Sequence, residues 1–202
     1  MQRQIVVATG NSGKFNEICE IFVGLPFCLL PMGNYWNPLP RIEENGTTFR
    51  ENARIKADWV FEHSSLWALA DDSGLIVDAL GGAPGVRSAR YAGTHADAAA
   101  NNTKLLSELY NVVAPDRTAR FACSVVLRID EATLLYADGY CEGRIIETPR
   151  GSAGFGYDPL FIPEGFDRTF AELTGEEKHG ISHRGKALKS LKEQLDGYYT
   201  QQ

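Results

Sequence analysis

The chain has 202 residues, 44% of them hydrophobic and 23% charged, a balance that is typical of soluble globular proteins and excludes disordered or collagen-like structure. A chain of this length buries a large core without disulfides or a structural metal. Its 20 basic and 26 acidic residues give a net charge of −6, and no basic run follows a phosphate backbone, so we expect no long nucleic acid as a partner.

The cysteines and the apolar runs indicate a cellular compartment. The four cysteines show no C-x-x-C spacing, and most lie among apolar residues, as reduced core cysteines do. No run approaches the ~18 apolar residues of a membrane span, and the first residues lack the apolar stretch of a signal peptide. We therefore expect a cytoplasmic protein without a membrane partner. The cysteines are Cys19, Cys28, Cys123 and Cys141.

The first segments predict a strand, a glycine turn and a helix. Residues 5–9 form an apolar run rich in β-branched side chains, which predicts a buried strand, and Gly10 and Gly13 mark the turn after it. Apolar side chains then recur at i, i+3, i+4 and i+7, on one face of a helix that ends at residues 24–26. These side chains are Phe15, Ile18, Cys19 and Phe22.

The next segments predict a loop, a helix and a strand. Residues 31–46 contain three prolines, several asparagines and the pair Glu43 and Glu44, which favours a loop. Thr47 or Thr48 then caps a helix that runs to about His63. Residues 66–70 predict another buried strand, which we expect to stop at the turn-forming residues 71–74.

The second half of the chain predicts a mixed sheet. After a glycine-rich loop at 81–85 we expect a helix at about 98–110, and residues 121–129 and 134–146 then favour a long antiparallel hairpin. Another glycine-rich loop at 151–158 and a short strand at 160–162 follow. The last helix has a core face made of Leu188, Leu191 and Leu195.

Residues 9–14, with the sequence TGNSGK, join the first strand to the first helix. At such a junction, free backbone N–H groups and the positive end of the helix dipole favour an anion, and Lys14 adds a full charge. The segment is not a P-loop, because its glycine-to-lysine spacing is too short and Phe15 stands where Ser or Thr would bind magnesium. A phosphate site and a tight turn with a solvated lysine both stay open.

Asp71 and Asp72 follow a strand, at the place where α/β proteins expose catalytic groups. Adjacent carboxylates hold a hard cation, activate a water or divide these tasks, although a β-turn selects the same residues. Glu43, Glu44 and Glu51 are further oxygen ligands for such an ion, or acids that are simply solvated or matched to a helix dipole.

Two later segments fit an anion or a planar base. Residues 182–185 (SHRG) and nearby Lys178 form a cationic cluster with forked and stacking donors, unless Ser182 is only a helix cap. Residues 155–158 (FGYD) combine aromatic faces with a carboxylate, a set that also anchors loops to a core. Phosphate donors, carboxylates, aromatic faces and edge-reading groups together suggest a nucleoside triphosphate site.

In chain order, these segments resemble the inosine and xanthosine triphosphate pyrophosphatases, the family that clears deaminated purine nucleotides from the nucleotide pool. The resemblance covers most of the chain. Its motifs are ATGNSGK at 8–14, TFRENA at 48–53 with Lys56, ADDSGL at 70–75, GGAPGV at 81–86, SARY at 88–91, GFGYDP at 154–159, EK at 177–178 and SHRG at 182–185.

The resemblance implies an elongated, two-lobed α/β fold around a long mixed sheet with flanking helices and an active-site cleft between the lobes. It also implies a single domain of residues 1–202, a homodimer, and Mg²⁺-dependent hydrolysis of deaminated purine nucleoside triphosphates (ITP, dITP and XTP) to the monophosphate and pyrophosphate. Glu44 and Asp72 would bind magnesium, and Asp72 would accept the proton of the attacking water. The implied substrate-binding residues are Thr9, Gly10, Asn11, Lys14, Lys56, Ser73, Phe155, Gly156, Tyr157, Asp158, Lys178, His183 and Arg184.

Base selectivity would depend on the purine edge. Hypoxanthine and xanthine carry an oxygen at position 6 where adenine carries an amino group, so a donor placed there is left unpaired by adenine. Guanine shares that oxygen, and its 2-amino group must be rejected separately.

Three alternatives stay open. A pyrophosphatase for modified pyrimidine nucleotides would need a smaller base pocket. A non-enzymatic nucleotide sensor would have little reason to combine Asp71, Asp72 and Glu44. A purely structural protein would leave the polar loops without a common partner.

Overall fold

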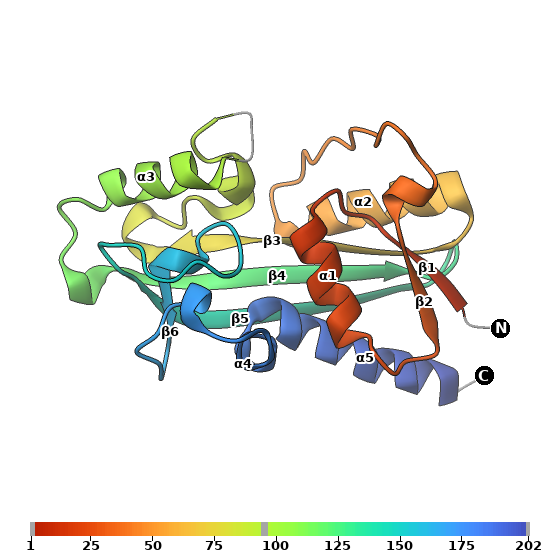
Figure 1. Ribbon diagram of the computed structural model, residues 1–202. Helices are drawn as coiled ribbons and strands as arrows, with labels where there is room; N and C mark the ends of the chain where they lie inside the picture. Colours follow the sequence, from red (N-terminus) through yellow and green to blue (C-terminus); the bar gives the residue numbers. More distant parts are fainter. Residues whose placement is uncertain (1–2, 94–96, 201–202) are drawn as a thin grey trace. The chain divides into compact units, whose positions relative to one another are not determined.

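The computed structural model describes residues 3–93 and 97–200. These residues include a mixed sheet with the strand order β2-β1-β3-β4-β5-β6 and helices that flank it (Figure 1). β1 pairs in parallel with β2 and with β3, whereas β5 pairs antiparallel with β6, so the predicted mixed α/β fold is confirmed. The strands are β1 (Arg3–Val7), β2 (Phe27–Pro31), β3 (Trp67–Val77), β4 (Thr118–Arg128), β5 (Leu134–Ile145) and β6 (Phe161–Pro163); the helices are α1 (Ser12–Ile21), α2 (Phe49–Ser64), α3 (Ala98–Glu108), α4 (Gly175–Ile181) and α5 (His183–Thr200).

The chain divides into two compact units. Unit 1 consists of Met1–Asp72, Cys123–Gly139 and Arg184–Gln202, and unit 2 consists of Ser73–Ala122 and Tyr140–His183. Strands β3, β4 and β5 contribute residues to both units. The two units agree with the expected two lobes, while the single domain and the cleft stay predictions.

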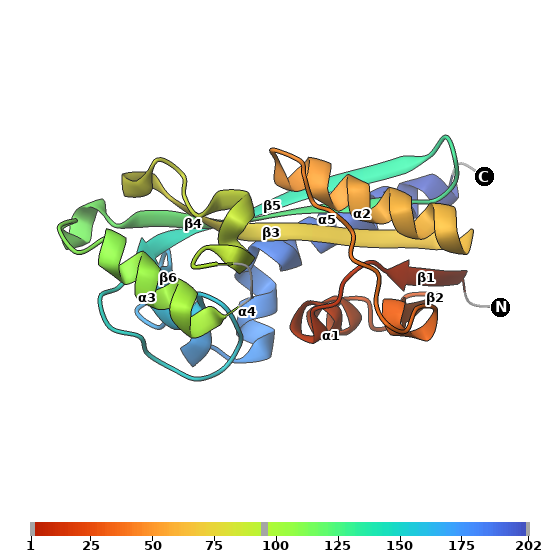
Figure 2. The same ribbon diagram turned by 90° about the horizontal axis from the view of Figure 1, so that it is seen from above.

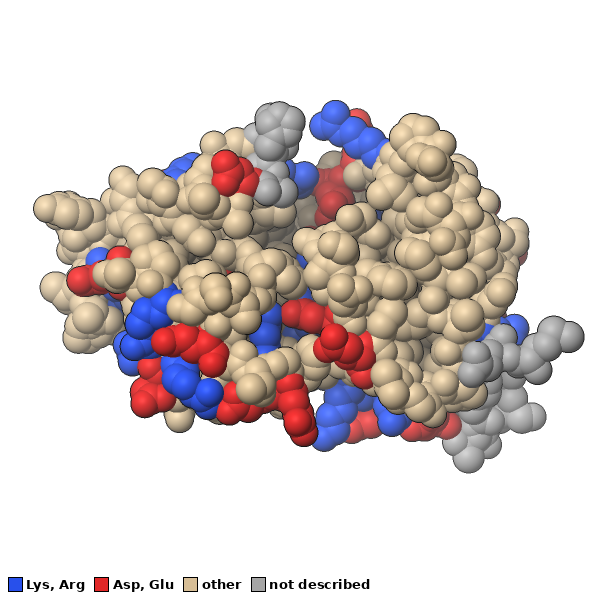
Figure 3. Space-filling model, viewed as in Figure 1, with Lys and Arg blue, Asp and Glu red and all other residues tan. Residues whose placement is uncertain are grey.

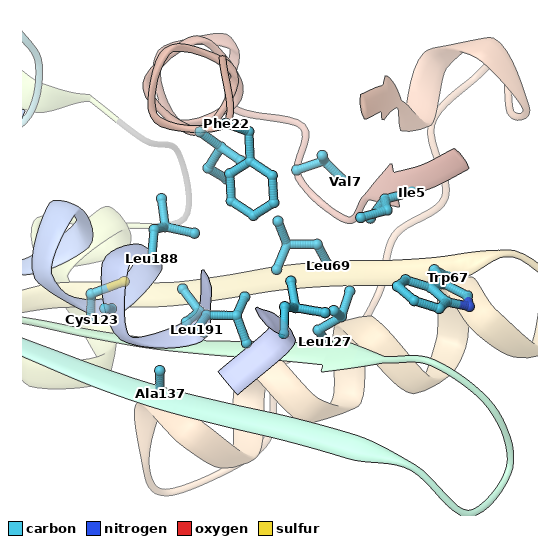
Figure 4. Close-up of a cluster of buried hydrophobic side chains, with 14 of the residues drawn as sticks. Ile5, Val7, Phe22, Trp67, Leu69, Cys123, Leu127, Ala137, Leu188 and Leu191 are labelled. Atoms are coloured by element: carbon cyan, nitrogen blue, oxygen red, sulfur yellow. The ribbon is translucent and has the colours of Figure 1, made fainter. Parts of the chain in front are cut away.

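Unit 1 has apolar side chains on both faces of its strands. Odd-numbered residues of β1 and β3, such as Val7 and Leu69, pack with α1 and α5, and even-numbered residues, such as Ala68, pack with α2. Figure 2 shows α1 and α2 on opposite sides of β3. In Figure 4, Leu69 lies between Phe22, which follows α1, and Leu191 of α5. This alternation follows from the period-2 geometry of a strand.

Unit 2 has an aromatic core of its own. Phe121 of β4 contacts Phe161 edge-to-face at a centroid distance of 4.8 Å and stacks on Phe170 at 5.7 Å. Leu105 of α3 and Leu160 complete the buried cluster, and both are fully buried. The unit therefore has its own hydrophobic packing.

Several elements begin where the sequence predicts. Asn11 caps α1 because its Oδ1 accepts a hydrogen bond from the backbone N–H of Lys14 at 3.1 Å. Thr48 rather than Thr47 caps α2, in a capping box with Glu51. The predicted hairpin is formed by β4 and β5, and Asp130 holds its turn by accepting N–H hydrogen bonds. All four cysteines are free, in agreement with the prediction.

The expected turn at residues 71–74 is wrong, because β3 continues through these residues to Val77. Gly74 indicates a close approach rather than a turn. A Cβ at this position would lie 2.3 Å from Ser88 Oγ and 2.5 Å from the Gly85 carbonyl oxygen. The sequence analysis also missed β2 and α4, and it placed residues 182–185 before the last helix, whereas α5 begins at His183.

Candidate functional site

The register of β1 and β3 places two carboxylates beyond the end of β1. Val7, the last residue of β1, lies opposite Leu69 of β3 in the parallel pair. Because β3 continues past this point, Asp71 and Asp72 extend to where the chain turns from β1 into α1. Neighbouring side chains on a strand point to opposite faces, so Asp71 faces α1 and α5 while Asp72 faces α2.

Asp71 is buried and lies between two cations, Lys14 and Arg184. We call these three residues and Glu17 the Asp71 network. Lys14 Nζ of α1 lies 3.0 Å from Asp71 Oδ2, and the Arg184 guanidinium of α5 donates to the same oxygen through Nε at 3.2 Å and Nη2 at 3.1 Å. Arg184 also pairs with Glu17 of α1. Burial alone would raise the pKa of Asp71, but Lys14 and Arg184 lower it well below its usual range, so Asp71 is ionised.

Asp72 belongs to a second set on the other face of β3. Lys56 Nζ of α2 lies 3.6 Å from Asp72 Oδ1 and 2.9 Å from Glu44 Oε2, so one ammonium contacts both carboxylates. Asn52 Nδ2 donates to Asp72 Oδ2 at 3.1 Å. Burial raises the pKa of Asp72, an effect that Lys56 and Lys14 oppose and Glu44 reinforces. A carboxyl with a raised pKa accepts a proton more readily than an ordinary aspartate.

Glu44 and Asp72, the acidic pair, fit a magnesium ion that completes its shell with substrate oxygens. Mg²⁺ in phosphate-processing sites is held by one or two carboxylates together with phosphate and water oxygens. The two carboxylates reach the same Lys56 ammonium, so their oxygens face a common point. In residues 3–93 and 97–200, no group of three or more His, Cys, Asp and Glu could hold a metal by itself.

Unit 2 contains a different set, built around one buried ion pair. Lys178 Nζ of α4 lies 2.8 Å from Asp158 Oδ2, and both side chains are buried. The same Asp158 oxygen accepts from the Phe155 backbone N–H at 2.9 Å. The Lys178 ammonium lies 5.1 Å from the Phe155 ring centroid and 5.6 Å from that of Phe170, within cation–π range. We call Asp158 and Lys178 the Asp158 pair.

Two further predicted residues of unit 2 are buried. Tyr157 donates its hydroxyl to the Ser88 carbonyl oxygen at 2.9 Å, and burial raises its pKa. His183 stacks on Phe121 at a centroid distance of 4.8 Å. Gly156 is tied to α3, since its carbonyl oxygen accepts from Asn102 Nδ2 at 3.1 Å.

The predicted residues thus gather in three groups. Lys14 joins Asp71, Lys56 and Glu44 join Asp72, and Phe155, Asp158 and Lys178 come together in unit 2. Thr9 and Asn11 form the turn before α1, where Thr9 Oγ1 accepts from the Asn11 N–H at 3.1 Å. Ser73 follows Asp72 on β3 and is half-buried.

Arg184 belongs to unit 1, whereas His183, its neighbour in the predicted SHRG segment, belongs to unit 2. Its guanidinium is buried and contacts Asp71 and Glu17 within unit 1. The substrate contact that the family resemblance implied for Arg184 stays a prediction.

Sequence reasoning gave no role to Asn52 and Glu17. Asn52 stands four residues before Lys56 on α2, and Glu17 stands three residues after Lys14 on α1. These spacings put each residue on the same helix face as the lysine, and that signal was available in the sequence.

The molecular surface has mixed charge on the face shown in Figure 3. Lys and Arg atoms lie interspersed with Asp and Glu atoms there, and the coloured residues form no continuous basic strip on this face. Within the described part of the chain, no helix is both long and apolar enough to cross a membrane.

Known proteins resemble this chain both in sequence and in fold. A dITP/XTP pyrophosphatase of Geobacter sulfurreducens is 50% identical over 192 residues, which cover 95% of this chain and 96% of that protein. Another from Thioalkalivibrio sulfidiphilus is 48% identical over 197 residues, covering 96% and 99%. The solved structure of a HAM1 protein from Coxiella burnetii is 44% identical and matches with a TM-score of 0.87, covering 96% of this chain and 99% of that one.

Residues 5–194 match the Ham1 family as a whole. This range contains the acidic pair, the Asp71 network and the Asp158 pair. The chain therefore belongs to the Ham1 family.

Proposed function

We propose that the protein hydrolyses deaminated purine nucleoside triphosphates to the monophosphate and pyrophosphate, with dITP, ITP and XTP as substrates. The observation that carries this proposal is the acidic pair with its shared lysine, together with the Lys14–Asp71 ion pair, since Asp71 and Asp72 are neighbours on β3. The dITP/XTP pyrophosphatases to which the chain is nearly 50% identical support it.

Residues of unit 1 bind the triphosphate and carry out the hydrolysis. Lys14, Lys56 and the backbone N–H groups at the start of α1 neutralise phosphate charge, in a turn that also contains Thr9, Gly10 and Asn11. Glu44 and Asp72 would hold Mg²⁺, which would neutralise phosphate charge and make the attacking water more acidic. Asp72 would accept the proton of the water that attacks the α-phosphorus.

Residues of unit 2 bind the base. Phe155 offers an aromatic face, and the Asp158 pair supplies a donor and an acceptor that are already oriented by each other. Ser73, Gly156, Tyr157 and His183 complete the predicted substrate contacts. A donor at the 6-oxygen of hypoxanthine or xanthine would be left unpaired by adenine, which can reduce the rate by orders of magnitude.

We further propose that the protein acts in the cytoplasm as a homodimer. The free cysteines are consistent with a reducing compartment. Sedimentation of the purified chain tests the dimer, and a mass of one chain at micromolar concentration would contradict it.

Pyrophosphate release from dITP, XTP, ITP, ATP, GTP and dUTP, each with Mg²⁺ and with EDTA, tests the reaction. The proposal predicts metal-dependent release from the three deaminated purines and far less from the others. Preference for dUTP would favour a pyrimidine pyrophosphatase. Thermal stabilisation by ITP without release from any nucleotide would favour a sensor.

A further inference from the structure

Asn52 is buried and links Asp72 of the acidic pair to the loop that carries Glu44. Its side chain is 1% exposed, and each end of its amide has a partner. Nδ2 donates to Asp72 Oδ2 at 3.1 Å, and Oδ1 accepts from the Gly46 backbone N–H at 2.8 Å. These partners fix the orientation of the amide, because a backbone N–H only donates and an ionised carboxylate only accepts.

Gly46 belongs to the segment that presents Glu44, two residues earlier. A Cβ at Gly46 would lie 2.8 Å from Asn52 Oδ1 and 2.6 Å from Glu51 Cβ, so the segment packs directly on the first turn of α2. Glu51 Oε2 accepts the backbone N–H groups of Thr47 at 2.6 Å and Thr48 at 3.1 Å. The loop is thus fastened to α2 at several points. Asn52, like Lys56, contacts both this loop and Asp72.

Asn52 and Lys56 contact different oxygens of the Asp72 carboxylate. They stand at i and i+4 on α2, so they share a helix face. Lys56 contacts Oδ1 of Asp72 as a cation, and Asn52 contacts Oδ2 as a neutral donor. A metal ion at the acidic pair would repel the Lys56 ammonium. The Asn52 amide is neutral and can keep its hydrogen bond to Asp72 with or without the metal.

We propose that Asn52 is a positioning residue for magnesium. Its amide holds the Asp72 carboxylate and the Glu44 segment at the separation that the ion requires. The inference rests on the proposed function, since it concerns the metal of that same site. Outer partners of metal ligands typically contribute about 10–100-fold in metal affinity or activity.

The test replaces Asn52 with residues that lack the paired amide. Asn52→Leu keeps a similar volume and removes both hydrogen bonds, and Asn52→Ser is a smaller polar variant in case the leucine prevents folding. Asn101→Ala is the matched control: Asn101 is also a buried helical asparagine whose amide holds backbone groups, of Ser88, Ala89 and Ala92, but it does so within unit 2.

Metal binding is measured directly with Mn²⁺, which takes the same oxygen ligands, by electron paramagnetic resonance. The sample contains an ITP analogue with a methylene group between the α- and β-phosphorus, which cannot release pyrophosphate. The expected result is a rise of about 10-fold or more in the Mn²⁺ dissociation constant for either Asn52 variant. The Mn²⁺ dissociation constant of Asn101→Ala should stay within about twofold of the wild-type value, even if its melting temperature falls as much as that of the Asn52 variants.

Kinetics give a second readout. The Mg²⁺ concentration that half-saturates pyrophosphate release should rise in the Asn52 variants, while KM for ITP at saturating Mg²⁺ stays within about threefold. An active wild type whose Mn²⁺ affinity and Mg²⁺ dependence are unchanged by folded Asn52 variants would overturn the positioning role and leave the function intact. A wild type that releases no pyrophosphate, but whose Mn²⁺ binding is weakened by Asn52→Leu, would overturn the function and leave the positioning role intact.

Discussion

Asp71 in unit 1 and Asp158 in unit 2 are both buried carboxylates paired with a lysine, but their surroundings differ. Asp71 shares its cations with further charged groups, because Arg184 also contacts Glu17. Asp158 pairs with Lys178, whose ammonium lies against aromatic rings. A network of several charges can adapt to an added metal ion and a triphosphate, whereas an ion pair beside aromatic rings is suited to a flat, uncharged group. The comparison supports the proposal that unit 1 carries out the chemistry and that unit 2 recognises the base.

Breaking the Asp158 pair should have the largest effect on stability. Lys178→Met leaves Asp158 buried without its cation, so the free energy of unfolding should fall by about 3–5 kcal/mol in urea denaturation. Arg168→Met is the matched control. Arg168 pairs at the surface, at 2.6 Å, with Glu177, the residue before Lys178 on α4. Equal losses in the two variants would show that burial of the Asp158 pair has no special importance.

Removing the proposed proton acceptor of unit 1 should mainly lower turnover. Asp72→Asn keeps the shape of the side chain and an oxygen for Asn52, but it cannot take up a proton. We expect kcat for ITP to fall by about 10²-fold or more, with a much smaller change in substrate binding. Asp138→Asn is the control, because Asp138 is a unit 1 carboxylate that contacts Arg50 and Ser124 instead. Near-normal kcat in Asp72→Asn would remove Asp72 from the mechanism.

The surface pair of Arg168 with Glu177 of α4 should give the smallest effect, and a pH-dependent one. Arg168 and the Thr174 backbone N–H lower the pKa of Glu177 to about 2, from an ordinary value of 4.5. A lowered pKa means that the ionised carboxylate stabilises the folded state above about pH 4.5 and that this contribution is lost as the pH falls towards 2. The stability difference between wild type and Glu177→Gln should therefore shrink from pH 6 to pH 3 in urea denaturation. A difference that grows on acidification would contradict this account.

Much of the fold could be predicted because local signals agree with tertiary packing. The apolar face of α1 and the capping box of α2 appear where the sequence places them. The turn at residues 71–74 failed because Asp, Ser and Gly favour turns locally, while here Lys14, Arg184 and Lys56 compensate the two carboxylates within a strand. Gly74 serves close packing against Ser88, which no local pattern reveals.

The candidate site was predictable in composition but not in grouping. Lys14, Lys56 and Lys178 each lie beside a carboxylate that the sequence analysis also selected. The pairing of Arg184 with Asp71 joins residues 113 positions apart, and periodicity carries no information on such contacts. The sequence places Asn52 on the same helix face as Lys56, but it does not show that the amide pairs with Gly46 and Asp72, and those two contacts give Asn52 its importance.

The division of roles between the units is tested most directly by one ratio, that of kcat/KM for ITP to kcat/KM for ATP. It is measured for the wild type, for Asp72→Asn in unit 1 and for Asp158→Asn in unit 2. We predict that Asp72→Asn lowers both constants by the same factor and leaves the ratio unchanged. Asp158→Asn disturbs the donor and acceptor proposed for the base edge, so it should lower mainly the constant for ITP and reduce the ratio. A ratio that changes in Asp72→Asn and stays at the wild-type value in Asp158→Asn would contradict the assignment.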